Sequence, residues 1–134
     1  MNGFPLKIVT PDGLQYDGMA EEVIVRTTTG DLGILAGHIN CIAPLGMGMA
    51  TIVIDGQKKY AACIGGMISM LNGSATLVPT TFEWADEIDI NRAEKAQQRA
   101  KAILADKNAT ATEQRMADAR LKRAVVRQSV ARLK

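Results

Sequence analysis

The sequence is poor in the residues that build metal centres, disulfide frameworks and membrane spans. Its 134 residues include two cysteines, Cys41 and Cys63, and one histidine, His38, with no second Cys or His at metal-ligand spacing. The longest apolar stretches are broken by Gly, Asp or Lys, and none approaches the roughly 18 uninterrupted apolar residues that span a bilayer. We therefore expect reduced, buried thiols, no metal site, and only an indirect association with any membrane.

Motifs of catalysis are missing as well. There is no Gly-rich phosphate-binding loop of the Walker type, no nucleophile paired with a base, and no cluster of metal ligands. Residues 1–5 show neither a secretory signal nor a transit-peptide pattern. We expect a non-enzymatic protein that stays in the compartment where it is made.

What the sequence does contain is a globular balance of residues with an uneven distribution of charge. Hydrophobic residues make up 47% and charged residues 22%, which is typical of a folded protein. Residues 1–85 carry four Lys/Arg against seven Asp/Glu, a net charge of −3, whereas residues 86–134 carry twelve against seven, a net charge of +5. Such a basic segment can face nucleic acid, phosphate ligands or an acidic protein surface, and charge alone does not choose among them.

The first part of the chain has the pattern of short β-strands separated by turns. The turn sequences are Pro11-Asp12-Gly13, Asp55-Gly56 and Asn72-Gly73, and the last two are strong β-hairpin signals. Many short strands with such turns predict a sandwich or a flattened barrel. The predicted strands cover residues 6–10, 22–26, 50–54, 58–64, 68–71 and 75–78.

After Pro79 glycine disappears, and the good helix formers Ala, Glu, Lys, Arg and Gln take over. Asp89 is an N-cap candidate for a first helix, residues 106–108 interrupt it, and Thr110 with Glu113 fits a capping box for a second. The predicted apolar faces are Ala93, Ala96, Ala100 and Leu104 on the first helix, and Ala117, Leu121, Ala124, Val125 and Val130 on the second.

These patterns together predict an α+β fold. An N-terminal antiparallel β-sandwich, residues 1–85, is followed by a C-terminal two-helix α-hairpin, residues 86–134. Because alanine faces remove little apolar area from water, packing of the hairpin should be weak, and its open and closed states should differ by only a few kcal/mol. The hairpin is therefore the part of the chain suited to a conformational switch.

Each predicted helix also carries a basic stripe at spacings i, i+3 and i+7. The stripes are Arg92, Lys95 and Arg99, and Arg120, Arg123 and Arg127. They are either solvated helix faces or, when the hairpin closes, a site where a polyphosphate relieves their mutual repulsion. Nucleic acid is disfavoured as a partner, because no aromatic residue follows Trp84 to stack bases and the acidic residues of the same segment would repel a phosphate backbone.

Several motifs occur in the order and spacing of a known family. Residues 9–13 (VTPDG), 30–38 (GDLGILAGH) and 65–66 (GG) resemble the β domain of ATP synthase epsilon subunits, and the likeness runs from about residue 6 to the C-terminus. Residues 88–93 (IDINRA) resemble the nucleotide-binding motif of some members. One departure is Ala36, where the family commonly has proline before Gly-His, and this should affect the stiffness of the loop.

The resemblance implies a non-catalytic rotor-stalk subunit of a bacterial, proton-translocating ATP synthase. Its β domain would bind the gamma subunit and the c-ring, which places it as a peripheral protein on the cytoplasmic face of the cell membrane. Its C-terminal helices would reach the alpha and beta subunits and inhibit ATP hydrolysis. His38 is then expected to have a structural or interface role.

The resemblance also implies that ATP is a regulatory ligand, not a substrate, which stabilises the folded-down, non-inhibitory hairpin. It leaves the participation of magnesium open. Two other readings remain at this stage: a free-standing ATP-sensing protein, which would not copurify with a rotary motor, and a basic nucleic-acid-binding module. The ATP-binding residues carried over from the family are Glu83, Ile88, Asp89, Arg92, Ala93, Arg99, Arg123 and Arg127. On the second helix, Arg120 or Lys122 is an alternative, because the register across the linker is open.

Overall fold

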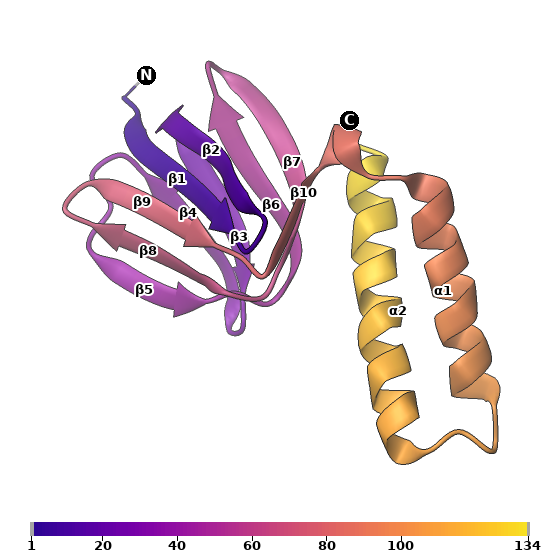
Figure 1. Ribbon diagram of the computed structural model, residues 1–134. Helices are drawn as coiled ribbons and strands as arrows, with labels where there is room; N and C mark the ends of the chain where they lie inside the picture. The colour runs from indigo at the N-terminus through magenta and orange to yellow at the C-terminus, as the bar shows by residue number, and fades with distance from the viewer. Residues whose placement is uncertain (1, 134) are drawn as a thin grey trace. The chain divides into compact units, whose positions relative to one another are not determined.

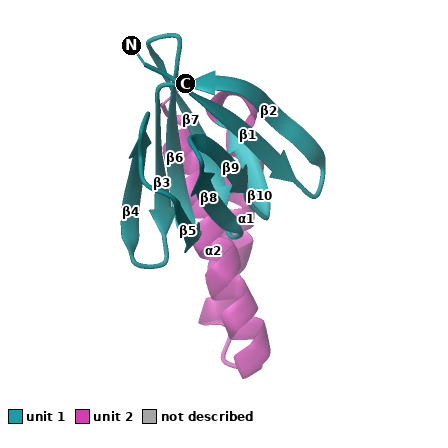
Figure 2. Ribbon diagram, turned by 90° about the vertical axis from the view of Figure 1, so that its left-hand side faces the viewer, with its two compact units in different colours: residues 1–84 teal, residues 85–134 magenta. Residues whose placement is uncertain are grey.

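The computed structural model describes residues 2–133, which form two compact units that divide between Trp84 and Ala85 (Figure 2). The division lies one residue before the predicted boundary. The first unit contains ten strands: β1 (Phe4–Thr10), β2 (Gly13–Ala20), β3 (Glu22–Thr27), β4 (Gly30–Leu35), β5 (Cys41–Pro44), β6 (Met47–Ile54), β7 (Gln57–Ile64), β8 (Met67–Leu71), β9 (Ser74–Val78) and β10 (Thr81–Trp84). The second contains the short 3-10 helix η1 (Ala85–Glu87) and the helices α1 (Ile90–Ala105) and α2 (Ala111–Ala131).

The strands, which are labelled in Figure 1, form two five-stranded sheets. One sheet has the order β2-β1-β9-β8-β5 and the other the order β10-β7-β6-β3-β4. Every pairing is antiparallel except that of β1 with β9, where Leu6 lies opposite Ala75. A parallel pair needs a long connection between its strands, and here β2 to β8 intervene. The predicted β-sandwich is confirmed, with this one parallel pair.

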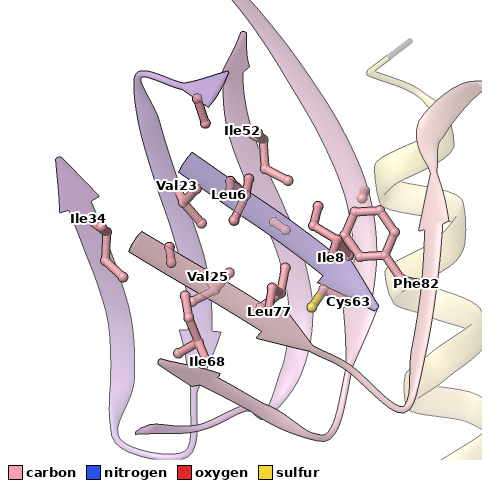
Figure 3. Packing of buried hydrophobic residues seen from close by; sticks show 14 of the residues in the cluster. Leu6, Ile8, Val23, Val25, Ile34, Ile52, Cys63, Ile68, Leu77 and Phe82 are labelled. Carbon is pink, nitrogen blue, oxygen red and sulfur yellow. The ribbon is translucent and has the colours of Figure 1, made fainter. Parts of the chain in front are cut away.

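The core of the first unit lies between the two sheets. Figure 3 shows Leu6, Ile8 and Leu77 from the first sheet directed toward residues of the second sheet such as Val23 and Ile52. All of these side chains are fully or almost fully buried. The alternating burial along β1, in which every second residue points inward, is what a strand with one core-facing side requires.

The two predicted hairpin turns are confirmed. Asp55 and Gly56 connect β6 with β7 with φ values of 52° and 76°, and Asn72 and Gly73 connect β8 with β9 with φ values of 50° and 82°. Two successive positive φ values are the mark of a type I′ turn, whose twist matches that of the flanking strands. These turns set the register of four strands.

The two cysteines are free thiols on different sheets, Cys41 on β5 and Cys63 on β7. Cys63 is buried as predicted, and burial raises the pKa of its thiol to about 12. The prediction that Cys41 is also buried is wrong, because β5 is an edge strand and leaves its side chain partly exposed. His38 lies in the loop before β5, with Nδ1 2.8 Å from the carbonyl oxygen of Ile39.

The second unit is an antiparallel α-hairpin, with both predicted caps in place. The side chain of Asp89 accepts a hydrogen bond from the backbone N–H of Arg92 at 3.1 Å, which caps α1. Thr110 and Glu113 form the reciprocal capping box of α2. These bonds satisfy backbone donors that helix starts leave unpaired.

The predicted apolar faces of the two helices are largely, not fully, confirmed. Ala93 and Ala100 on α1 are buried, as are Ala117, Ala124 and Val130 on α2. Val125 is 44% exposed, and its prediction was wrong. Apart from Val130, the buried positions of α2 are 117, 124, 128 and 131, which lie on one side of the helix, and position 125 is about 100° from position 124.

Candidate functional site

The predicted nucleotide-binding residues at the start of α1 lie in a capped helix terminus. Ile88 precedes the helix and is buried, and Asp89 is the N-cap. Ala93 is buried, and its N–H donates to the carbonyl oxygen of Asp89 at 3.1 Å, closing the first turn. This arrangement leaves Arg92 exposed on the first turn, immediately before a buried residue.

Glu83, by contrast, lies in the first unit, on β10. It pairs with Ala62 of β7 and is half-buried. Its neighbours Phe82 and Trp84 have ring centroids 4.9 Å apart in an edge-to-face arrangement. Since Phe82 points into the core of the sandwich, strand alternation directs Glu83 to the opposite face of its sheet.

A hydrogen bond between the helices gives the register of the hairpin. Nε2 of Gln128 on α2 donates to Oε1 of Gln97 on α1, so these two residues lie opposite each other. Arg99 is two residues and Arg127 one residue from this pair, both toward the connecting loop, which is about 1.5 to 3 Å along the helix axes. Arg123 lies about 7.5 Å from the pair in the same direction, and Arg92 about 7.5 Å in the other.

The four arginines also share one side of the hairpin. Each of them comes directly before a buried residue in the sequence. The pairs are Arg92 before Ala93, Arg99 before Ala100, Arg123 before Ala124, and Arg127 before Gln128. Each arginine is therefore offset from the buried face of its helix by about 100° in the same sense. An antiparallel pair has an approximate two-fold axis perpendicular to the plane of its helices, so residues with the same offset fall on the same side of that plane. We call this set the arginine edge.

Three lysines lie elsewhere, whereas Arg120, three residues before Arg123, lies on the same side of α2 as the arginine edge. Lys101 comes directly after Ala100 and falls on the opposite side of the hairpin, whereas Lys95 points away from the buried face of α1. Lys122 forms an ion pair with Asp118 at 3.0 Å. The predicted stripe of Arg92, Lys95 and Arg99 therefore contributes two of its three residues to the arginine edge.

Two members of the arginine edge, Arg92 and Arg99, lack a neutralising carboxylate in the described part of the chain. Nε of Arg123 donates to the carbonyl oxygen of Ala119 at 3.4 Å, and Nε of Arg127 is buried. Guanidinium groups from two helices, close in height and on one side, form a surface that attracts an anion with several oxygens.

Sequence reasoning did not identify Gln97 and Gln128 as part of the contact between the helices. Gln128 is buried, and Gln97 is partly buried. Their spacing was a usable signal, because each stands four residues after a buried alanine, Ala93 or Ala124. Because both residues are polar, the apolar pattern of the sequence did not include them.

Comparison with known proteins shows close relatives over the full length. The chain is 40% identical over 134 residues to the ATP synthase epsilon chain of Bacillus cytotoxicus, with all of both chains covered. It is 42% identical over 131 residues to that of Bacillus velezensis, with 98% of each chain covered. The chain belongs to the ATP synthase epsilon chain family. The resemblance seen in the sequence is confirmed.

Two family models divide the epsilon chain between them. The model described as "ATP synthase, Delta/Epsilon chain, beta-sandwich domain" matches residues 3–85, and "ATP synthase, Delta/Epsilon chain, long alpha-helix domain" matches residues 86–132. The protein is accordingly a non-catalytic subunit of the proton-transporting ATP synthase. In the part of the chain that the structure describes, no helix combines the length and apolarity needed to cross a bilayer.

Solved structures share the fold at low sequence identity. A chain of the Euglena gracilis mitochondrial ATP synthase, in a structure of OSCP, F1 and the c-ring, aligns with a TM-score of 0.83 and 20% identity, covering 98% of this epsilon chain and 82% of that chain. A chain of the Tetrahymena thermophila mitochondrial enzyme, from its central stalk and c-ring, aligns with a TM-score of 0.58 and 13% identity, covering 95% of each.

Proposed function

We propose that this epsilon chain is a central-stalk subunit that binds the gamma subunit and the c-ring through its β-sandwich. The full-length identity to bacterial epsilon chains supports this, as does the fold shared with chains from c-ring-containing structures. The protein is then peripheral, held at the cytoplasmic face of the bacterial cell membrane by its partners. Its helical hairpin is the regulatory part, which reaches the alpha and beta subunits when it opens and inhibits ATP hydrolysis.

We further propose that ATP binds the closed hairpin along the arginine edge. The observation that carries this proposal is that Arg99, Arg127 and Arg123 lie within about 6 Å of one another along the helix axes and on one side of the hairpin. Arg92 and Arg99 have no carboxylate partner within residues 2–133. A triphosphate would satisfy these guanidinium groups with charge-assisted hydrogen bonds. Ile88, Asp89 and Ala93 at the helix start, with Glu83, would contact adenine and ribose.

The regulatory consequence follows from linkage. If ATP binds only the closed hairpin, it stabilises that state by RT ln(1 + [ATP]/Kd), which is about 2.7 kcal/mol at a hundredfold excess over Kd. A hairpin held together by alanine contacts has open and closed states close enough in free energy for this to change their populations. High ATP therefore holds the inhibitory arm closed, and low ATP releases it.

Calorimetric titration of the purified chain with ATP and with ADP, each with and without magnesium, tests the site. We expect saturable binding that prefers ATP, weakened by about tenfold to a hundredfold in Arg99→Ala and in Arg92→Ala. Lys101→Ala is the matched control, because it removes a cation from the same helix on the opposite side of the hairpin. Equal losses in Arg99→Ala and Lys101→Ala would reduce the site to non-specific charge attraction, and absence of binding would refute it.

Assembly with the other subunits tests the regulatory part. When the epsilon chain is added to a complex of alpha, beta and gamma subunits, ATP hydrolysis should be inhibited at low ATP and released as ATP rises. Inhibition that is indifferent to ATP concentration would contradict the regulation while leaving the subunit assignment intact. A chain that binds ATP but does not assemble on gamma would instead act as a free-standing sensor.

A further inference from the structure

The alanine contacts between α1 and α2 do little to fix the register of one helix against the other. Its buried residues are mainly alanines, and they recur at similar spacings on both helices, for example Ala93 and Ala100 on α1 and Ala117 and Ala124 on α2. Because the buried alanines stand seven residues apart on each helix, a slide of one turn, about 5.4 Å, sets them against leucine or glutamine positions. Alanine–leucine contacts then replace alanine–alanine ones, so apolar burial alone distinguishes weakly between neighbouring registers.

The Gln97–Gln128 pair distinguishes the observed register from its neighbours. Each amide finds a partner on the facing helix in the observed register. After a slide of one turn, Gln128 would face an alanine, and an amide at a position that is 8% exposed would lose its hydrogen bond without gaining full access to water. A single polar pair in an otherwise apolar helix contact is an effective device for fixing register.

Register matters here because the arginine edge is built from both helices. Arg99 and Arg127 are close in height only while Gln97 lies opposite Gln128. A slide of one turn would change the separation of these guanidinium groups along the helix axes by about 5.4 Å. This change exceeds the spacing between neighbouring oxygens of a phosphate chain. The glutamine pair thus positions the arginines of the site and need not contact a ligand itself.

We propose that Gln97 and Gln128 are positioning residues that fix the register of the closed hairpin and thereby align the arginine edge. The alignment with respect to ATP rests on the proposed function, whereas the fixing of register does not. The two parts can therefore be tested separately.

Distance measurement between two spin labels on the full chain, without ATP, tests the register. Labels at Asn91→Cys and Arg115→Cys lie near opposite ends of the hairpin, so a slide changes their separation by most of its length. Cys41→Ser and Cys63→Ala remove the native thiols. We expect one narrow distance in this background, and a broadened distribution with components displaced by about 5 Å in Gln97→Leu/Gln128→Leu.

In the double variant Gln97→Leu/Gln128→Leu, called the Leu pair, each leucine has about the volume of the glutamine that it replaces. Helix content and thermal stability should therefore persist while the register is lost. Gln98→Leu, at an exposed position next to Gln97, is the matched control and should leave the distance narrow. If the double variant loses helix content by circular dichroism, Gln97→Leu alone gives the same comparison. A distribution in the Leu variants as narrow as the background, at the same distance, would overturn the proposal.

ATP titration of the same variants tests the consequence. We expect the Leu pair to weaken ATP binding by at least tenfold although every arginine is retained, and Gln98→Leu to leave it unchanged. If the wild-type chain binds no ATP, the proposed nucleotide site fails and the distance measurement still decides the register. If register is lost in the Leu pair but ATP affinity is retained, the positioning role is overturned.

Discussion

The two units of this epsilon chain bury very different side chains. The sandwich buries Leu, Ile, Val, Met and Phe residues between its sheets, whereas the buried residues of α1 are two alanines and those of α2 are mainly alanine. At about 25 cal/mol per Å² of apolar area, a buried alanine contributes a small fraction of what a buried leucine does. The same chain therefore combines a strongly held sandwich with a weakly held hairpin.

The units also differ in how their charges are used. The segment 1–85 has a net charge of −3 and the segment 86–134 a net charge of +5. In the hairpin, the repulsion among arginines on one side opposes closure, and weak alanine packing does little to offset it. An anionic ligand bound along the arginine edge would reverse the sign of that contribution, as the proposed function requires.

Truncating the core of the sandwich should produce the largest effect. Leu77 is fully buried between the sheets, so Leu77→Ala should lower the free energy of unfolding by about 2–5 kcal/mol. Urea unfolding followed by the fluorescence of Trp84, the single tryptophan, measures this change. Ala124→Gly in the hairpin should leave the Trp84 transition within about 0.5 kcal/mol of wild type; equal shifts in the two variants would mean that the units unfold as one.

The buried thiol of the sandwich should give a pH dependence that the hairpin lacks. Burial raises the pKa of Cys63 to about 12 from 9.0, so between these values the folded chain keeps a proton that the unfolded chain has released. The free energy of unfolding should therefore fall as the pH rises through this window, by about 1.4 kcal/mol at pH 10. Urea unfolding at pH 8 and pH 10 should show this loss in wild type relative to Cys63→Ala; identical pH dependence in both would contradict it.

Removing a helix cap should produce the smallest and most local change. Thr110→Ala deletes the side chain that accepts from the N–H of Glu113, which should destabilise α2 by about 1 kcal/mol. Circular dichroism and hydrogen exchange should report faster opening of the first turns of α2, with the amides of β6 and β7 unchanged. Thr112→Ala, two residues further along the same helix, is the control and should have little effect on α2.

Much of this fold could be predicted because its signals are local. Asp55-Gly56 and Asn72-Gly73 define hairpins through φ values that few other residues adopt, and Thr110 with Glu113 marks a helix start within four residues. The parallel pairing of β1 with β9 could not be predicted in this way. It depends on contacts between strands more than sixty residues apart, which leave no pattern in either strand.

The candidate site shows the same limit. The arginine edge was recognisable in part, since Arg92 and Arg99 recur at helical spacing. Which arginines share a side depends on which residues face the other helix, and Gln97, Gln128 and Ala131 were absent from the predicted faces. Exposure of Val125 has the same cause, because the buried side of α2 turns away from that position.

Amide hydrogen exchange of the whole chain, with and without saturating ATP, is the measurement that tests the contrast between the units most directly. Without ATP, the amides of α1 and α2 should exchange much faster than those of β3, β6 and β7. With ATP, exchange in the two helices should slow by about tenfold or more while the strands stay unchanged. Equal protection of helices and sandwich without ATP, or an ATP effect spread evenly over both units, would contradict this account of a fixed platform and a ligand-controlled hairpin.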